Sequence, residues 1–569
     1  MEMSELPLVK VFKMFRSRWL AAALAAGLAT PFARAAATHG IIATVHPAAT
    51  EAGLAVLKQG GNAIDATVAA ALTLGVVDGE NSGIGGGCFI LIRTADGSFH
   101  GIDGRETAPA AATRGMFVRN GKADSALSQT GALASGTPGA LAAYAFALEH
   151  FGRKKLDELI LPAADLAETG FKIDSSYAND LKSVASDLGR FESARKVFFR
   201  SDGKILAAGD WLKQPDLAKT YRAIAEDGVN WFYRGPFADA LDAWMTENQG
   251  LLRKEDLRTY RVQIREPVVT TYRGFEIVGF PPPSSGGVHV TQILNVLENF
   301  DMNRLDSVTR LHVIAEAMKL AFADRAFWLG DPDFAPVPRG LVDKNYAAQL
   351  AGMIRLTNVA AVSSHGTPPG WQTNLFTRHT THFSVADVEG NWVACTATIN
   401  TSFGSKVLVP GTGVILNNQM DDFSAQPGVA NYFGLIGAEA NAIAPGKRPL
   451  SSMSPTLVLK DGKPLYALGA AGGPKIISDV VLELVNLLDR GMTPRQAVEE
   501  PRIHHQWVPD ELLVEKTLPQ NIKEGLRARG HKVRDSLGMG VSQIVGRTKD
   551  GSAFEGAADP RAGGTADGW

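Results

Sequence analysis

The stretch "RHTTHFSVAD", residues 378–387, begins a β-rich run directly after a segment that has no hydrophobic period. The preceding residues, from about 351 to 379, scatter Ser, Gly, Pro and Thr in a way that is typical of a loop. "TTHFSVAD" and "NWVACTAT" then flank the tripeptide "VEG", and this arrangement predicts a β-hairpin. The first strand of that hairpin therefore starts with two threonines at the end of a long predicted loop.

The length of the hairpin loop decides which residue faces these threonines. A three-residue loop with its glycine in the left-handed conformation fits "VEG" and pairs Asp387 with Asn391. That register places Thr398 opposite Thr380, whereas a two-residue loop would place Thr398 opposite Thr381. In both cases a second threonine hydroxyl lies beside the start of the strand.

A threonine hydroxyl is a poor nucleophile unless a base lies within hydrogen-bond distance. The sequence has no G-x-S-x-G elbow, no H-E-x-x-H motif and no Cys/His spacing typical of zinc. If a chain began at such a threonine, its own α-amine, with an unperturbed pKa of about 8, could accept the proton. The pattern leaves the ordinary alternative open, because threonine is also a favoured strand residue.

The N-terminal segment has the pattern of an export signal. Basic residues precede the apolar run 19–29, and small residues follow with A-x-A spacing at Ala33 and Ala35. The run is too short to span a bilayer as a helix. We predict a signal peptide at 1–35, with cleavage after Ala37 and an N-terminal membrane tether as alternatives. The mature protein is expected in the periplasm or outside the cell, without a stable membrane span.

Composition excludes some partners and leaves others open. The 569 residues contain 57 Lys and Arg against 59 Asp and Glu, a net charge of -2, which gives no electrostatic reason to expect nucleic acid or an anionic membrane surface as a partner. Only two cysteines are present, so no disulfide framework is implied. Cys88 and Cys395 are expected to be small buried apolar residues.

The remaining patterns predict a mixed α and β chain. Residues 49–77 read as two helices, the second capped by Asn62. "SGIGGG" (82–87) precedes the strand-like "CFILIRT" (88–94); a phosphate loop would follow a strand and end in Lys, so we expect a tight turn instead. Further helices are predicted within 137–262, 281–300 and 310–330, and strands near 266–280 and in the C-terminal part.

Several long motifs occur in a specific order. "TTHFSVAD", "NNQMDDFS", "KRPLSSMSPT" and "AAGGPK" together resemble the γ-glutamyltranspeptidase family, the glutathione hydrolases. The resemblance extends over nearly all of the predicted exported chain and includes "GGNAIDA", "SGIGGGCF", "DGRETAPA", "PPPSSGGVH", "ADRAFWLGDPDF" and "GAADPR". Members are N-terminal-nucleophile hydrolases that mature by autocatalytic cleavage of a precursor (zymogen).

The resemblance implies a fold class and a division of the chain. We expect an α+β, four-layer αββα sandwich in which two autoprocessed subunits share one core. The large subunit would be residues 36–379 and the small, catalytic subunit residues 380–569, which together form a heterodimer.

The resemblance also implies catalytic residues. Thr380 matches the nucleophile, released by cleavage between His379 and Thr380, and Thr398 matches the threonine that hydrogen-bonds it. Gly472 and Gly473 match the pair whose backbone N–H groups form the oxyanion hole, where glycine allows close backbone approach.

Further matches concern the substrate's γ-glutamyl group. Arg105 matches the residue that holds the α-carboxylate, a task suited to the planar guanidinium fork. Asp422 matches the acid that pairs with the α-ammonium. Taken singly, these residues could equally be a surface ion pair and a turn residue. The residues expected to assist them are Ser451 and Ser452 at the carboxylate, and Asn400 and Gln419 at the ammonium.

The implied reaction is acyl transfer through a γ-glutamyl ester on Thr380. Glutathione and other γ-glutamyl amides would be donors, and water, amino acids or peptides would be acceptors; no metal or organic cofactor is required. One alternative is a related acylase that acts on glutaryl groups, as in cephalosporin precursors. A second is an exported binding protein that never cleaves itself.

Two positions depart from the family pattern. Bacterial members often carry a tyrosine in the lid that follows the Asp-Asp pair. The lid segment here, "FSAQPGVANYFGLIG" (423–437), has Phe433 at that place with Tyr432 beside it. We therefore expect the lid to lack one hydrogen bond, which would alter the balance between water and amine acceptors. The stretch "AAGG" also lacks the serine and proline that usually precede the glycines.

Overall fold

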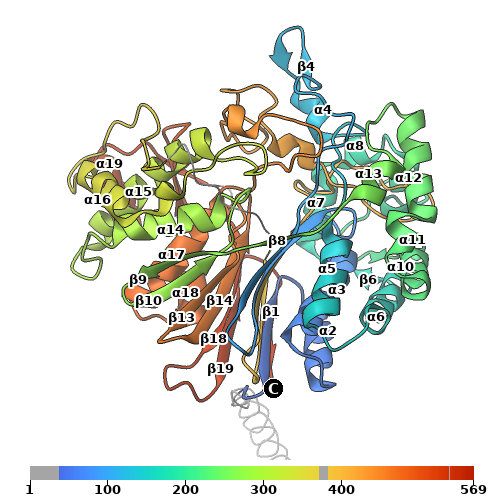
Figure 1. Ribbon diagram of the computed structural model, residues 1–569, viewed down its shortest axis with the longest axis horizontal. Coiled ribbons are helices and arrows are strands. Elements are labelled where there is room, and N and C mark those ends of the chain that lie inside the picture. Colours follow the sequence, from blue (N-terminus) through green and yellow to red (C-terminus); the bar gives the residue numbers. More distant parts are fainter. Residues whose placement is uncertain (1–36, 371–381, 537) are drawn as a thin grey trace, which may run out of the picture. The chain divides into compact units, whose positions relative to one another are not determined.

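Two β-sheets packed face to face, with helices on both outer faces, form the described part of the chain (Figure 1). The structure is a computed structural model that describes residues 37–370, 382–536 and 538–569. The predicted signal peptide, His379, Thr380 and Thr381 lie outside these residues. The layer order is helix, sheet, sheet, helix, which confirms the predicted α+β, αββα architecture.

The larger sheet of the described residues is antiparallel throughout, in the order β20-β1-β11-β12-β2-β3-β8. Its central strands come from distant parts of the sequence. The strands are β1 (Gly40–Thr44), β2 (Gly87–Arg93), β3 (Phe99–Gly104), β8 (Gln263–Arg265), β11 (Phe383–Asp387), β12 (Trp392–Thr398) and β20 (Thr565–Gly568).

The second sheet has the order β19-β18-β14-β13-β10-β9 in the described part of the chain. It faces the larger sheet mainly where β11 and β12 lie over β14 and β18. Its strands are β9 (Val268–Tyr272), β10 (Phe275–Gly279), β13 (Thr456–Lys460), β14 (Lys463–Ala471), β18 (Val541–Arg547) and β19 (Phe554–Ala558).

Strands of the larger sheet bury both faces, which explains their nearly continuous apolar sequences. In β2, Phe89 and Leu91 point into the core between the sheets, whereas Cys88 and Ile90 pack under the helices on the other side. Alternate side chains of a strand point to opposite faces, so both sets are buried. Trp392 of β12 is fully buried between the sheets.

Both sides of the 371–381 segment contribute to this core. β1 and β2 precede the segment, β11 and β12 follow it, and all four are neighbours in one sheet. In the second sheet β10 precedes the segment and pairs with β13, which follows it. A break in the segment would therefore leave both fragments in one shared core.

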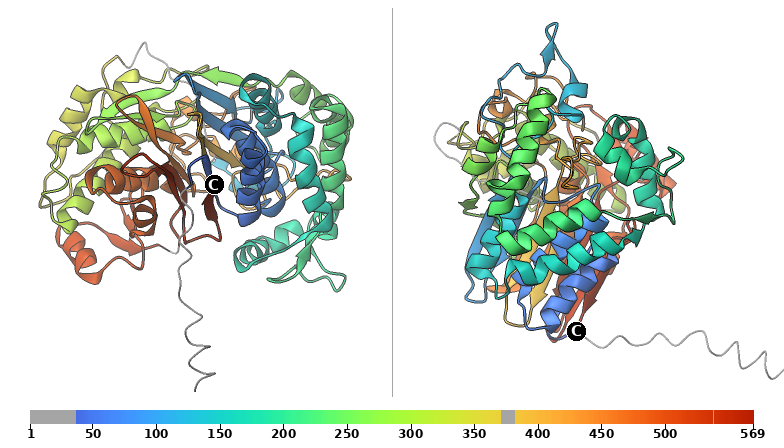
Figure 2. Two further views of the ribbon diagram at one scale, coloured as in Figure 1. Left: turned by 90° about the horizontal axis from the view of Figure 1, so that it is seen from below. Right: turned by 90° about the vertical axis from the view of Figure 1, so that its right-hand side faces the viewer.

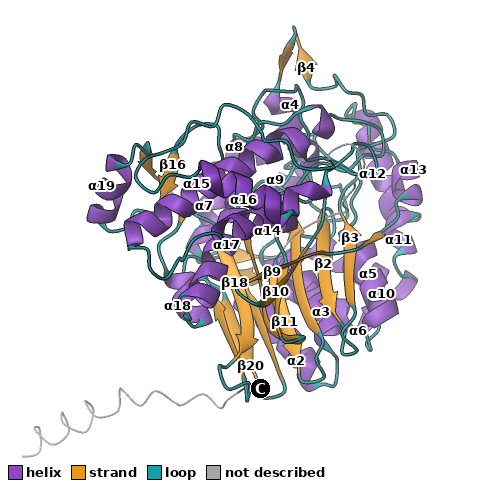
Figure 3. Cartoon of the chain, turned by 60° about the vertical axis from the view of Figure 1, so that its left-hand side comes forward, coloured by secondary structure: helices purple, strands orange, loops and turns teal. Residues whose placement is uncertain are grey.

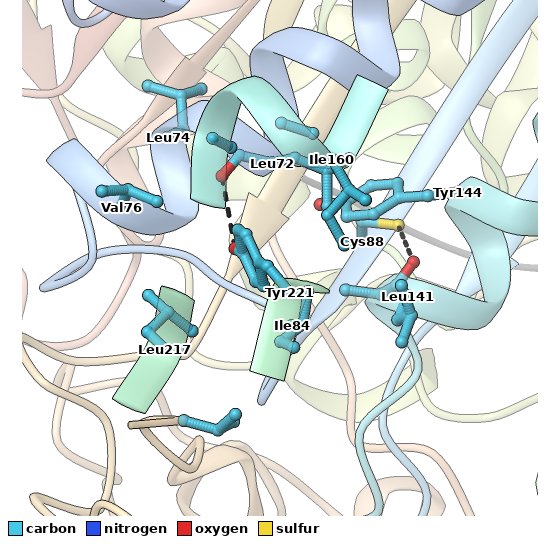
Figure 4. Close-up of a cluster of buried hydrophobic side chains, with 14 of the residues drawn as sticks. Leu72, Leu74, Val76, Ile84, Cys88, Leu141, Tyr144, Ile160, Leu217 and Tyr221 are labelled. Carbon is cyan, nitrogen blue, oxygen red and sulfur yellow. Dashed lines mark hydrogen bonds between the residues drawn. The ribbon is translucent and has the colours of Figure 1, made fainter. Parts of the chain in front are cut away.

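Helices on the outer face of the larger sheet surround a buried helix. Every residue of α3 is buried, which is typical of a helix whose sequence is apolar on all sides apart from Asp65 and two threonines. Figure 4 shows part of the surrounding cluster, where Tyr221 Oη donates to the carbonyl of Leu72 (3.3 Å) and Cys88 lies beside Tyr144. Both cysteines are buried free thiols, as predicted. The helices are α2 (Pro47–Lys58), α3 (Ala63–Val77), α5 (Ala140–Phe151), α6 (Leu156–Thr169) and α10 (Pro215–Asp227).

The second sheet is covered by a separate set of helices (Figures 2 and 3). α14 (Gly286–Leu297), α17 (Lys475–Leu484) and α18 (Pro494–Glu499) pack on the sheet, and α15 (Ser307–Trp328) packs on α14. α17 continues into a π-helical turn at Val485–Asp489. None of the helices in the described residues is both long and apolar enough to cross a membrane.

The remaining elements are short or peripheral. The helices are α4 (Ser125–Gln129), α7 (Ser175–Ser183), α8 (Ala185–Leu188), α9 (Glu192–Phe198), α11 (Asn230–Tyr233), α12 (Pro236–Glu247), α13 (Lys254–Thr259), α16 (Lys344–Met353) and α19 (Gln520–Ala528), with 3-10 turns at η1 (Arg339–Val342), η2 (Gln419–Asp422) and η3 (Glu439–Asn441). The strands are β4 (Val118–Arg119), β5 (Lys122–Ala123), β6 (Phe171–Lys172), β7 (Trp211–Leu212), β15 (Ile503–His504), β16 (Leu512–Val514) and β17 (Val533–Asp535).

The β11–β12 hairpin has the predicted three-residue loop. Phe383 pairs with Cys395, the N–H of Asp387 donates to the carbonyl of Asn391 (3.1 Å), and Gly390 has φ +100°. This is the register that was predicted to place Thr398 opposite Thr380, although Thr380 itself lies outside the described residues.

Asp387, at the end of β11, connects the hairpin to α3. Its Oδ2 accepts from the N–H of Ala63 (2.9 Å) and from Asn391 Nδ2 (2.8 Å), while Oδ1 accepts from the N–H of Asn391 (3.0 Å). A carboxylate at a helix N-terminus is favoured by the helix dipole. The predicted cap is also present, because Asn62 and Asp65 form a reciprocal capping box.

Replacing Asp387 should therefore destabilise the fold. Asp387→Ala leaves two buried N–H groups without their acceptor, and we expect the free energy of unfolding to fall by about 2–4 kcal/mol. Asp387→Asn, which keeps one acceptor oxygen, should lower the free energy of unfolding by less than Asp387→Ala does. Urea unfolding followed by tryptophan fluorescence measures the difference. The control is Asp96→Ala, at an exposed turn residue whose Oδ1 accepts from the N–H of Ser98 (3.0 Å); equal effects of the two alanine variants would contradict the prediction.

Candidate functional site

A cavity of about 310 Å³, here called the site cavity, brings most of the predicted residues together. It lies where the end of β12, the 3-10 turn η2 and the β14–α17 turn meet. Arg105 does not line it but contacts a residue that does. Thr380 lies outside the described residues. The predicted residues that line the cavity are Thr398, Asn400, Gln419, Asp422, Ser451, Ser452, Gly472 and Gly473.

Arg105 and Asp422 form an ion pair in which the arginine side chain is fully buried and the aspartate side chain is 11% exposed. Arg105 Nη2 donates to Asp422 Oδ2 (2.5 Å), and Gln419 Nε2 donates to the same oxygen (3.1 Å). Arg105 is fully buried, with Nε held by the carbonyl of Pro449 (3.3 Å). Burial raises the pKa of Asp422, and the Arg105 charge opposes this rise. The two residues predicted for opposite ends of a zwitterion thus contact each other, so a ligand with both charges can separate them without leaving either unpaired.

Arg105 has a second carboxyl group beside it. Glu106 Oε2 lies 3.7 Å from Arg105 Nη1, and neither oxygen of Glu106 has a hydrogen-bond partner among the described residues. Burial raises the pKa of Glu106 to about 8, opposed by Arg105. Glu106 was not among the predicted site residues, although it follows Arg105 in the motif "DGRETAPA". At neutral pH this carboxyl group is mostly protonated, so it lies next to the guanidinium without compensating its charge, and it does not line the cavity.

Arg325 is the main site residue that the sequence analysis missed. It lies on α15, lines the cavity, and donates from Nε to Ser285 Oγ (2.9 Å) and from Nη2 to Ser452 Oγ (2.9 Å). Burial lowers the pKa of Arg325 to about 10, opposed by the Asp422 charge, so it remains a cation at neutral pH. The motif "ADRAFWLGDPDF" contains it, but nothing in the sequence indicates that it reaches Ser452.

Backbone hydrogen bonds hold the two serines. The N–H of Ser451 donates to the carbonyl of Pro283 (2.8 Å), and Ser285 donates to the carbonyl of Ser451 from N (2.8 Å) and from Oγ (2.6 Å). The predicted Pro/Gly turn before α14 therefore fixes the position of Ser451 and Ser452 in the cavity wall.

Gly472 and Gly473 form the turn between β14 and α17. Their φ angles are +138° and +60°, in the region that favours glycine. A Cβ atom would lie 2.7 Å from Gly540 Cα at position 472 and 2.7 Å from the Phe433 ring at position 473. Neither N–H group donates to an acceptor in the described part of the chain. Two free donors in a cavity wall are suited to stabilise a developing oxyanion.

Thr398 and Asn400 lie at the end of β12. The N–H of Asn400 donates to Thr398 Oγ1 (2.8 Å), and Asn400 Nδ2 donates to the carbonyl of Asn418 (3.0 Å). Asn400 has φ +81°, a conformation that asparagine tolerates better than most residues. Because Thr398 Oγ1 accepts from the backbone, its own proton is available for another group in the cavity.

The lid segment covers one side of the cavity. The N–H of Tyr432 donates to Asp421 Oδ2 (3.2 Å), Asn431 Oδ1 accepts from the N–H of Phe433 (3.1 Å), and Gln506 Nε2 donates to the carbonyl of Phe433 (3.3 Å). Phe433 lines the cavity and Tyr432 is mostly exposed. The lid side chain that lies against Gly473 is therefore a phenylalanine ring, which has no hydroxyl to donate.

His382, in the motif "TTHF", is a structural residue. Its Nε2 lies 2.7 Å from Ser384 Oγ and 3.1 Å from the carbonyl of Gln543. Burial lowers the pKa of His382 to about 3, which makes it a weak base. The described residues contain no cluster of three or more His, Cys, Asp or Glu side chains arranged to hold a metal ion.

Comparisons with known proteins identify the family that this chain resembles. A family model described as Gamma-glutamyltranspeptidase matches residues 49–569. A glutathione hydrolase proenzyme from Escherichia coli is 45% identical over 530 residues, 92% of this chain and 91% of the relative. An acylase ACY 1 proenzyme from a Pseudomonas species is 39% identical over 546 residues, 93% of this chain and 94% of the relative.

The similarity extends to a solved structure. A cephalosporin acylase from Bacillus halodurans has a TM-score of 0.84 at 30% identity and covers 95% of this chain and 98% of its own. The predicted N-terminal-nucleophile hydrolase fold is thereby confirmed.

The buried state of His382 predicts a pH dependence of stability. Its pKa, about 3 when folded, lies below the usual 6.5, so the unfolded chain binds the extra proton and stability falls as pH drops from 6.5 toward 3. His382→Gln should remove about 2 kcal/mol of the loss between pH 6.5 and 5. Urea unfolding at the two pH values measures it, with the exposed His150→Gln as control. An unchanged loss in His382→Gln would contradict the prediction.

Proposed function

The chain belongs to the gamma-glutamyltranspeptidase family, and from this premise we propose that it transfers γ-glutamyl groups from glutathione and other γ-glutamyl amides to water or to amino acids and peptides. It is an enzyme of the glutathione hydrolase type. The transfer would proceed through a γ-glutamyl ester on Thr380.

The buried Arg105–Asp422 pair carries the choice of substrate. A γ-glutamyl group has a carboxylate and an ammonium on one carbon, so it can bind Arg105 and Asp422 at the same time. A glutaryl group has no ammonium, and its binding would leave the Asp422 charge buried without a partner. Leaving one member of a buried pair uncompensated is strongly unfavourable.

The proposed chemistry uses Thr380 as both nucleophile and base. Its Oγ attacks the γ-amide carbon while its α-amine takes the hydroxyl proton. The oxyanion is stabilised by the N–H groups of Gly472 and Gly473. The C–N bond then breaks, the leaving amine takes the proton, and the γ-glutamyl ester remains. Water or an acceptor amine attacks the ester carbon and regenerates Thr380.

The same hydroxyl would free its own amine in the precursor. Thr380 Oγ attacks the carbonyl of His379, the amide becomes an ester by an N-to-O shift, and water hydrolyses the ester. The E. coli relative is named a proenzyme, which supports processing of this chain as well. The products, residues 36–379 and 380–569, would remain a heterodimer because strands of one fragment pair with strands of the other in both sheets. We place the mature enzyme in the periplasm or outside the cell, after removal of residues 1–35.

A glutaryl or cephalosporin acylase is the second candidate, because acylases are among the relatives in both sequence and structure. Asp422 argues against it, for the reason given above. A non-cleaving binding protein is a third possibility that a denaturing gel distinguishes by a single full-length band.

Thr380→Ala should abolish both self-cleavage of the precursor and turnover of γ-glutamyl donors. Without the hydroxyl, we expect one full-length band on a denaturing gel and no release of nitroaniline from γ-glutamyl-p-nitroanilide. Thr381→Ala, the matched control, should still be cleaved into two fragments. Normal cleavage or turnover by Thr380→Ala would refute the proposed nucleophile.

Asp422→Asn should weaken recognition of the ammonium. Loss of one charge-assisted contact predicts a rise of about 10- to 100-fold in KM for γ-glutamyl-p-nitroanilide. KM for glutaryl-p-nitroanilide, which has no ammonium, should stay the same or fall. A wild-type enzyme that prefers the glutaryl anilide would favour the acylase instead.

A further inference from the structure

A second cavity, here called the outer cavity, lies against the far side of the lid and has a volume of about 490 Å³. It shares Tyr432, Phe433, Gly472 and Pro474 with the site cavity. The two cavities therefore border each other at the lid and at the Gly472 end of the β14–α17 turn. A molecule in the outer cavity lies next to the turn whose N–H groups face the reacting carbonyl in the proposed reaction.

The polar groups of the outer cavity include two cations and one carboxylate, Lys475, Arg534 and Glu511. Lys475 Nζ contacts Ser536 Oγ (3.3 Å) and the carbonyl of Gly538, and within the described residues no carboxylate forms an ion pair with it. Arg534 Nη1 pairs with Glu511 Oε2 (3.1 Å) at the surface, where the arginine side chain is 69% exposed. The cavity thus has an excess of one positive charge.

His504, which also lines the outer cavity, does not change its excess of one positive charge. Burial lowers the pKa of His504 to about 3, and its ring nitrogens lie 2.7 Å from Ser478 Oγ and 3.0 Å from Gln506 Oε1. His504 is therefore neutral at physiological pH. Gln506 Nε2 also donates to the carbonyl of Phe433, so this side of the outer cavity holds the lid where the two cavities meet.

We propose that the outer cavity binds the carboxylate end of the peptide that leaves from, or attacks, the γ-glutamyl ester, and that Lys475 and Arg534 are its carboxylate-binding residues. The inference rests on the proposed function and assigns a site to its second substrate. A dipeptide spans about 7 Å from its amine to its carboxylate. Its amine can therefore lie near the Gly472–Gly473 turn while its carboxylate lies beyond Phe433.

The dipeptide that leaves during acylation and the dipeptide that attacks during transfer should occupy the same site. The leaving dipeptide of glutathione and an attacking dipeptide each have an amine at the reacting carbon and a carboxylate at the other end. In transfer, the acceptor nitrogen bonds to the ester carbon, the bond from that carbon to Thr380 Oγ breaks, and the amine proton passes to Oγ through the α-amine of Thr380. This is the reverse of acylation, so the two peptides occupy the same place.

The test compares acceptors with and without a carboxylate. γ-Glutamyl-p-nitroanilide is the donor because its leaving group has no carboxylate, and glycylglycine is compared with glycylglycinamide as acceptor. The wild-type enzyme should use glycylglycine with a lower KM than the amide. Arg534→Gln and Lys475→Gln should each raise KM for glycylglycine about five- to tenfold and leave that for the amide nearly unchanged. Arg534→Lys, which keeps the positive charge, should retain most of the preference for glycylglycine over glycylglycinamide.

Two further features make the result decisive. Lys549→Gln, an exposed residue between β18 and β19, is the control for the change in net charge. Because Arg534 is exposed, its substitution tests the proposal even if Lys475→Gln disturbs the contacts to Ser536 and Gly538. Equal KM values for the two acceptors in the wild type, or an unchanged preference in Arg534→Gln, would overturn it. A protein that releases no nitroaniline without an acceptor would instead refute the proposed function.

Discussion

The ion pair between Arg105 and Asp422 is the contact on which the site depends. A guanidinium with no exposure to solvent is unfavourable unless its charge is compensated, and here the Asp422 carboxylate compensates it. A ligand with both a carboxylate and an ammonium replaces this one ion pair with two, one to Arg105 and one to Asp422. A ligand with a carboxylate alone pairs with Arg105 and leaves the Asp422 charge without a partner. Selectivity for the zwitterionic end of a substrate thus follows from burial as well as from hydrogen bonding.

The two sheets keep this pair beside the proposed reaction centre. β12 positions Thr398, the β14–α17 turn positions Gly472 and Gly473, and strands from both sides of the 371–381 segment hold the sheets together. Phe433 lines both the site cavity and the outer cavity, at the place where the two meet. Its side chain is apolar, and its backbone N–H and carbonyl bond to Asn431 and Gln506.

The local features of the fold could be predicted because neighbouring residues determine them. The three-residue loop and its glycine set the register of β11 and β12, and Asn62 with Asp65 marks the start of α3. The glycines before β2 precede a strand, as expected. The resemblance to a family added residues in order along the chain, and eight of the ten predicted site residues line one cavity.

The sequence by itself determined the hairpin register, the helix caps, the family and the residue types of the site. Only the tertiary structure decided which of these residues touch. Arg105 meets Asp422 across 317 positions, and Arg325 meets Ser452 across 127. Such contacts depend on how sheets and helices pack, and no local period encodes them. For the same reason Arg325, Glu106 and the outer cavity beyond Phe433 could be found only after the layers were in place.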